Sequence, residues 1–141
     1  MKEIWKSIPE YKGLYEVSNM GRVRKACSNG GWKKFHILKP RFGYNRRYLV
    51  VRLHKNKLIK EYAVHGLVLL AFRGLCPKGM EGSHLNDVKL DNRLKNLRWG
   101  THKQNTTDAI RNGIGGFFRK GHKDSLETRK RKSIAQKKRY V

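Results

Sequence analysis

The first 63 residues alternate between short apolar runs and turn residues, which is the pattern of a β-rich region. The candidate strands lie at 14–18, 22–24, 48–53 and 58–62. Asn19-Met20-Gly21 and the polar stretch 54–57 fall between them as turns, and the second turn joins two strands as a hairpin. Alternation in Arg22-Val23-Arg24 places both arginines on one face of a strand. The pattern therefore predicts a small antiparallel sheet with one basic face.

From residue 63 the apolar positions take up the period of a helix. One stripe is formed by Val64, Leu67, Val68, Ala71 and Phe72. Gly74 suits the first position beyond a helix, and Pro77 prevents continuation, so a core helix is expected over 63–73. We expect His65, at the start of this helix, to satisfy polar groups of the helix end or the core rather than to act in catalysis.

A second helix is predicted at 101–113. Thr101 and Gln104 fit a capping box at its start, and Asn112-Gly113 supplies its end. The segment between the helices has the pattern of a hairpin, with arms near 82–85 and 96–99 around the polar loop 87–95. A hairpin followed at once by a helix can gather side chains from all three segments around one small cleft.

The net charge of the chain indicates the class of molecule that it binds. The 141 residues carry 34 Lys and Arg against 10 Asp and Glu, for a net charge of +24. Because self-repulsion at this density opposes compaction, we expect the phosphate backbone of a nucleic acid as partner. We expect no membrane association, since no run approaches a spanning length and Met1-Lys2-Glu3 begins no signal peptide. Two cysteines exclude a disulfide framework and a four-cysteine zinc site, which favours an intracellular location in the cytoplasm or nucleoid.

The positive charge gathers towards both ends of the chain. Residues 1–63 carry sixteen basic and four acidic groups, residues 64–116 eight and four, and residues 117–141 ten and two. We therefore expect binding surfaces at the two ends and the chemistry between them. The expected DNA contacts are Arg22, Arg24, Lys25, Arg46, Arg47 and Arg52 on the sheet, with Arg119, Lys120, Arg129, Lys130, Lys132, Lys137 and Lys138 in the tail. Charge alone would also suit an RNA-binding module.

Three polar residues could carry the chemistry of that middle region. His84 lies on the first arm of the predicted hairpin, Asn96 begins the second arm, and Asn105 lies one turn inside the following helix. A neutral imidazole can take a proton from water at physiological pH. An amide oxygen can bind a hard divalent cation, with water and phosphate completing the shell. The arrangement suits metal-assisted hydrolysis of a phosphodiester bond.

The sequence segments around these residues resemble a known family. Ser83 to Asp87, Leu90 to Thr101 and Gln104-Asn105 closely resemble the HNH motif of phage and intron homing endonucleases, and the helix that begins at Val64 is part of that resemblance. Ile4 to Val23 is similar to the NUMOD4 segment that commonly precedes such nucleases. Lys120 to Lys130 is more loosely similar to NUMOD3-type DNA-binding repeats.

The resemblance implies an α+β fold: a small antiparallel N-terminal sheet, a ββα-metal nuclease core and a basic C-terminal helix. Residues 1–63 would form a NUMOD4-like DNA-binding region, 64–113 the nuclease core, and 114–141 a joint and a DNA-binding tail. His84 matches the general base of the family, Asn96 the position that braces the loop and the histidine, and Asn105 the metal-binding position. The implied activity is that of a DNA endonuclease dependent on Mg²⁺ or Mn²⁺, without a small-molecule cofactor.

One residue departs from the family pattern. The position before the base is often Asp or His and holds the metal, but here it is Ser83, whose neutral hydroxyl is a poorer ligand. We expect Ser83 with Asn105 at the metal, or a metal that relies on Asn86, Asp87 or phosphate oxygens instead. The alternative is a non-catalytic DNA-binding protein on a degenerate HNH scaffold. No apolar helical stripe is left over for a dimer interface, so we expect a monomer that nicks one strand.

Overall fold

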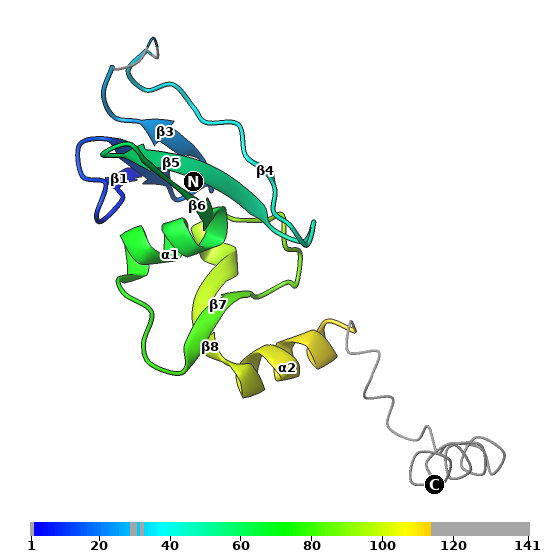
Figure 1. Cartoon of the computed structure of the whole chain (residues 1–141). Helices are drawn as coiled ribbons and strands as arrows, with labels where there is room; N and C mark the ends of the chain where they lie inside the picture. The colour runs from blue at the N-terminus through cyan, green and yellow to red at the C-terminus, as the bar shows by residue number, and fades with distance from the viewer. Residues whose placement is uncertain (1, 29–30, 32, 114–141) are drawn as a thin grey trace, which may run out of the picture.

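The computed structural model describes residues 2–28, 31 and 33–113 (Figure 1). Their elements, in chain order, are strands β1 (Trp5–Ser7), β2 (Tyr15–Ser18), β3 (Val23–Lys25), β4 (Arg41–Phe42), β5 (Leu49–Lys55) and β6 (Leu58–Ala63), helix α1 (Val64–Arg73), strand β7 (Met80–His84), the 3-10 turn Leu94–Asn96, strand β8 (Leu97–Thr101) and helix α2 (His102–Arg111). The α+β class predicted from the sequence is confirmed. The predicted tail contacts and the C-terminal helix lie outside the described residues.

The N-terminal strands form two sheets where the sequence predicts one. The first sheet has the order β1-β2-β3 and the second the order β4-β5-β6, and all pairings are antiparallel. The pattern of apolar residues misses β1 and β4 because these two strands are short and mostly exposed. Val23 is buried on the inner face of β3, as the alternation predicts.

The β5–β6 hairpin is tighter than the sequence suggests. Its strands pair as far as Lys55 with Leu58, so two residues make the turn instead of four. Asn56 and Lys57 both adopt positive φ, 51° and 64°, the backbone of a two-residue turn that suits the twist of the strands. The two strands are therefore paired up to the turn itself, from Val50 with Ala63 to Lys55 with Leu58.

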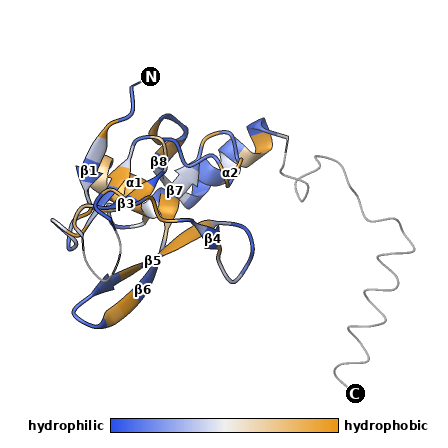
Figure 2. Cartoon of the chain, turned by 90° about the horizontal axis from the view of Figure 1, so that it is seen from above, coloured by the Kyte–Doolittle hydropathy of each residue, from blue (hydrophilic) through white to orange (hydrophobic). Residues whose placement is uncertain are grey.

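Helix α1 is the centre of the hydrophobic core. It buries Val64, Leu67, Val68 and Leu69 against β2, β5, β6 and β8, and Figure 2 shows this apolar helix lying among the strands. Gly74 ends the helix with φ 83°, as predicted. One cluster of buried side chains runs from Ile8 to Leu97, so the N-terminal sheets and the segment after residue 63 share a single core.

Helix α2 begins with the predicted capping box. The Thr101 hydroxyl accepts a bond from the Gln104 backbone at 3.3 Å, and the Gln104 side chain accepts one from the Thr101 backbone at 2.9 Å. Gly113, with φ 74°, follows the last turn. Because the capping residue is also the last residue of β8, the helix starts directly at the hairpin, and it packs on β7 and β8. None of the helices among the described residues is long and apolar enough to cross a membrane.

Candidate active site

A cavity of about 140 Å³ opens between β7, the loop after it and α2. The residues that line it are Tyr48, Glu81, Gly82, Ser83, His84, Asp87, Lys89, Asn105 and Asp108. The structure thus brings His84, Ser83 and Asn105 to one place, although 21 positions separate the imidazole from the amide. Asn96 does not belong to this lining.

Because β7 is pleated, its side chains point alternately towards helix α1 and towards helix α2. Gly82 and His84 share the face towards α1, where a side chain on Gly82 would meet His65 at 3.0 Å. Glu81 and Ser83 share the opposite face, where Asn105 of α2 donates a bond to Glu81 at 2.6 Å. The β-hairpin therefore holds the imidazole against one helix and presents its hydroxyl and carboxylate to the other.

His84 is fixed by a buried hydrogen bond. Its Nε2 atom lies 3.0 Å from Oδ1 of Asn92, and the two residues are 2% and 5% exposed. An amide oxygen can only accept, so Nε2 carries the proton and Nδ1 is left as the basic atom. Burial lowers the pKa of His84 below 6.5, and the bond to Asn92 opposes this effect in part. At neutral pH the imidazole is therefore an uncharged base.

Asn92 is a site residue that the sequence reasoning missed. Asn92 lies within a segment that resembles the HNH motif. That segment is also a polar loop, where an asparagine is usually a turn residue, so the sequence does not single out Asn92. The turn at Gly21 packs directly on it: with φ 80°, Gly21 approaches so closely that a Cβ there would lie 2.8 Å from the Asn92 Cβ. The backbone of Asn19 also accepts a bond from Leu94 at 2.9 Å. The N-terminal segment thus supports the loop that holds the His84 imidazole.

Asn96 stabilises the loop that contains Asn92 through two hydrogen bonds of its side chain. Its Oδ1 accepts a bond from the Asn86 backbone at 3.0 Å, and its Nδ2 donates one to the Asp91 carbonyl at 2.9 Å. The Asn96 side chain is buried, and both bonds are at least partly buried with it. Asn96 is placed to brace the loop, whereas the residue bonded to the imidazole is Asn92.

Three rings meet at the inner side of the cavity. The His84 ring lies edge-on to His65, with centroids 5.1 Å apart, and stacks on Tyr48 at 6.1 Å. Burial, and next the proximity of His84, lower the pKa of His65 to about 4. Its Nδ1 atom is buried without a hydrogen-bond partner. His65 therefore packs as a neutral ring directly against the predicted base, and its Nδ1 does not satisfy a polar group of the helix end or the core as the sequence led us to expect.

The lining of the cavity offers oxygen atoms for a cation. Oδ1 of Asn105 is buried without a partner, an arrangement that costs free energy unless a ligand satisfies it. Ser83, 7% exposed, and the carboxylates of Glu81, Asp87 and Asp108 complete the set of oxygens. No three His, Cys, Asp or Glu side chains of the described residues form a metal-binding group by themselves. A hard cation that shares its shell with amide, hydroxyl, water and phosphate oxygens fits this donor set.

The arginines predicted to face DNA lie at the surface of both N-terminal sheets. Arg22 is bonded to Glu3, and Arg24 pairs with Glu16 at 2.7 Å while its guanidinium lies 4.0 Å from the Trp5 ring centroid. Arg52 lies 3.5 Å from Glu61. Arg46 and Arg47 are exposed in the β4–β5 connection, and Lys25 is partly buried at the end of β3.

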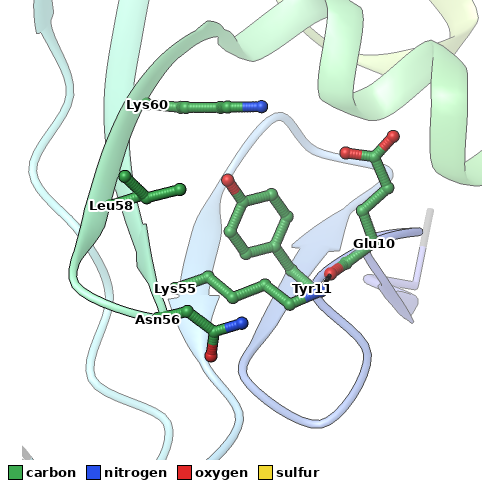
Figure 3. A pocket seen from close by; sticks show the side chains of 6 residues that line it. All are labelled: Glu10, Tyr11, Lys55, Asn56, Leu58 and Lys60. Atoms are coloured by element: carbon green, nitrogen blue, oxygen red, sulfur yellow. Dashed lines mark hydrogen bonds between the residues drawn. The ribbon is translucent and has the colours of Figure 1, made fainter.

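A second cavity, of about 150 Å³, has a different lining. It lies between the tip of the β5–β6 hairpin and the turn at Glu10 and Tyr11, with Lys55 and Lys60 at its walls (Figure 3). Tyr11 donates or accepts a 3.2 Å bond with the hydroxyl of Tyr62. No imidazole lines this cavity, so the features needed to activate water belong to the first one.

Comparisons with known proteins match two segments of the chain to family models. Residues 62–107 match the family model described as HNH endonuclease, and residues 3–54 match the model of the NUMOD4 motif. The DNA endonuclease I-HmuI of Bacillus phage SP01 is 35% identical over 109 residues, which are 77% of this chain and 59% of that protein. An uncharacterized HNH endonuclease of Acanthamoeba polyphaga mimivirus is 36% identical over 115 residues, 79% of this chain and 27% of its own length.

A solved structure shows the same fold. It describes DNA binding and cleavage by the HNH homing endonuclease I-HmuI, and it superposes with a TM-score of 0.65 at 32% identity. The match covers 79% of this chain and 60% of that one. The chain thus spans about three fifths of the length of the phage relative.

Proposed function

Because the chain belongs to the HNH endonuclease family and carries a NUMOD4 segment ahead of its nuclease module, we propose that it is a divalent-metal-dependent DNA endonuclease that nicks DNA. The observation that carries this proposal is the shared cavity of His84 and Asn105. A buried neutral base and an unsatisfied amide oxygen within one small space can supply a general base and a cation ligand for metal-assisted hydrolysis of a phosphodiester.

In the proposed mechanism His84 is the general base. Nδ1 takes a proton from the attacking water, and the bond from Nε2 to Asn92 keeps the ring in the tautomer that can do so. The bonds of Asn96 keep the loop, and with it Asn92, in place during the reaction. The rings of His65 and Tyr48 limit rotation of the imidazole.

Mg²⁺ or Mn²⁺ would be held on the α2 side of the cavity, by Asn105 and by the hydroxyl of Ser83. An ion bound there supplies charge neutralisation at the phosphate and at the departing 3′ oxygen. The unpartnered Oδ1 of Asn105 supports this assignment, since a cation would satisfy it.

We assign DNA binding to the two ends of the chain. Residues 1–63 contribute the sheet arginines and residues 114–141 the basic tail, while 64–113 carry the chemistry. A single imidazole at the His84 cavity suits a monomer that cuts one strand at a time, and the relatives from phages suggest action on DNA inside a bacterial host cell.

The test of the proposed activity is conversion of supercoiled plasmid in Mg²⁺ or Mn²⁺. The expected product is the open circle, with the linear form appearing later. Immediate linear product would contradict nicking. Failure to cut any duplex or single-stranded DNA, including phage genomic DNA, would contradict the activity itself.

A second candidate is a DNA-binding protein without catalysis, which Ser83 favours because it removes a usual metal ligand. The Ser83→Asp variant discriminates between the two. Cleavage by the variant, from a parent that binds DNA but does not cut it, would establish a decayed nuclease.

A further inference from the structure

Glu81 occupies an unusual position in the cavity. It stands two residues before Ser83 on β7, so the pleat places the two side chains on one face, towards α2. Its carboxylate lies 2.6 Å from the Asn105 side chain. Gly100, its partner across the hairpin, leaves the space that Asn105 fills, because a Cβ there would lie 2.8 Å from Oδ1 of Asn105. Position 83 has no carboxylate, but Glu81 provides one two residues earlier on the same face of the strand.

The other two carboxylates of the cavity are already neutralised. Asp108 accepts a bond from Arg98 at 2.6 Å and lies 3.0 Å from Arg111. Asp87 is paired with Lys89. Among the ion pairs of the described residues, Glu81 occurs with His102 alone, at 3.6 Å, and that contact is charged only when the imidazole is protonated. Glu81 is therefore the cavity carboxylate that forms no ion pair with a lysine or arginine of the described residues.

The contact between the Glu81 and Asn105 side chains has a geometry that could accommodate a cation. In the structure the amide turns Nδ2 to the carboxylate and leaves Oδ1 buried without a partner. Rotation of the amide by half a turn would exchange the two atoms and set oxygen against oxygen, which is stable only with a cation between them. Neighbouring oxygens in an octahedral Mg²⁺ shell are about 2.9 Å apart, close to the separation of the two side chains.

We propose that Glu81 is the anionic metal ligand of this site and acts with Asn105 in place of the usual residue at position 83. This inference rests on the proposed function, since it concerns the ion of the same cavity. The negative charge of the metal site would then lie at position 81, on the same face of β7 as position 83, and not at the residue beside His84.

The test measures Mn²⁺ binding to the full chain by electron paramagnetic resonance, in the presence of an uncut DNA duplex. Glu81→Gln keeps an oxygen that can accept the bond from Asn105, so the fold is retained while the charge is lost. We expect its Mn²⁺ affinity to fall by about tenfold or more. Adding Ser83→Asp to that variant should restore the affinity. Glu10→Gln, which removes an equal charge beside the second cavity, is the matched control and should bind as the parent does.

The inference is overturned if Glu81→Gln binds Mn²⁺ as the parent does, if Glu10→Gln loses as much affinity, or if the parent shows no bound Mn²⁺ at millimolar concentration. A melting curve for each variant separates loss of the ion from loss of the fold. The proposed function is judged separately by plasmid nicking, so a nuclease whose ion does not depend on Glu81 would refute this inference alone.

Discussion

His84 and Asn92 are joined by a 3.0 Å hydrogen bond in the interior of the protein, eight residues apart in the chain. The bond determines which nitrogen of the imidazole carries the proton, and therefore which one can act as a base. Asn92 is in turn held by Gly21, from the N-terminal segment. The residue proposed to activate water is thus positioned by a part of the chain that resembles a DNA-binding module.

Replacement of Asn92 tests this relationship. In Asn92→Ala the Nε2 proton loses its partner and the imidazole can change tautomer. We expect the single-turnover rate of cleavage to fall about tenfold or more, a fraction of the 10²–10⁴ that a positioned base contributes. DNA affinity should stay unchanged. Asn86→Ala, an exposed amide of the same loop, is the control, and an equal loss of rate there would show that the loop matters rather than the bond.

Gly21→Ala tests the support from the N-terminal segment. The residue has φ 80°, so any side chain is strained by about 1–3 kcal/mol, and its Cβ would also collide with Asn92. Gly13→Ala is a matched control, since φ is 78° there but no atom lies within 4 Å. Chemical denaturation should show a larger loss for Gly21→Ala than for Gly13→Ala, together with slower cleavage by the former. Equal losses of stability would contradict the close approach.

Stability should depend on pH through His65. The unfolded chain takes up a proton near pH 6.5, whereas the folded protein does so only near pH 4. The free energy of unfolding is therefore at its full value above pH 6.5 and falls as the pH drops towards 4, by about 3 kcal/mol at most. Urea denaturation at several pH values measures this loss. His65→Phe should lose less over the same range, and an unchanged slope would show that another group is responsible.

DNA binding should weaken steeply with salt. Six to ten phosphate contacts imply a loss of affinity of about 10³- to 10⁵-fold between 50 and 200 mM salt. Fluorescence anisotropy with one duplex over that range measures the slope. Comparison with an RNA duplex distinguishes a DNA-binding protein from an RNA-binding one. An affinity that does not change with salt would contradict the assignment of the basic surfaces.

The sequence predicts best where local patterns determine structure. The stripe of α1, the capping box of Thr101 and Gln104, and the hairpin around the polar loop all recur in the structure, because each depends on residues close in the chain. The division into two N-terminal sheets does not follow from any local pattern. Tertiary contacts decide it, and strands of both sheets pack on α1.

The same distinction holds for the site. The order of hairpin and helix, together with the resemblance to the HNH motif, predicts that His84 and Asn105 share a cavity, and both residues line it. The parts played by Asn92, Tyr48 and Glu81 could not be predicted in this way. Each acquires its place from a neighbour remote in sequence: Gly21 for the first, the ring of His84 for the second and Asn105 for the third.

The most direct test of the central claim compares His84→Ala with the parent, measuring DNA affinity and the single-turnover rate of cleavage on one substrate in Mn²⁺. If His84 is the base, the variant binds DNA as the parent does and cuts it about 10²- to 10⁴-fold more slowly. A variant that cuts at the parental rate, or that loses binding and cleavage together, would contradict the assignment of His84 as the residue that activates water.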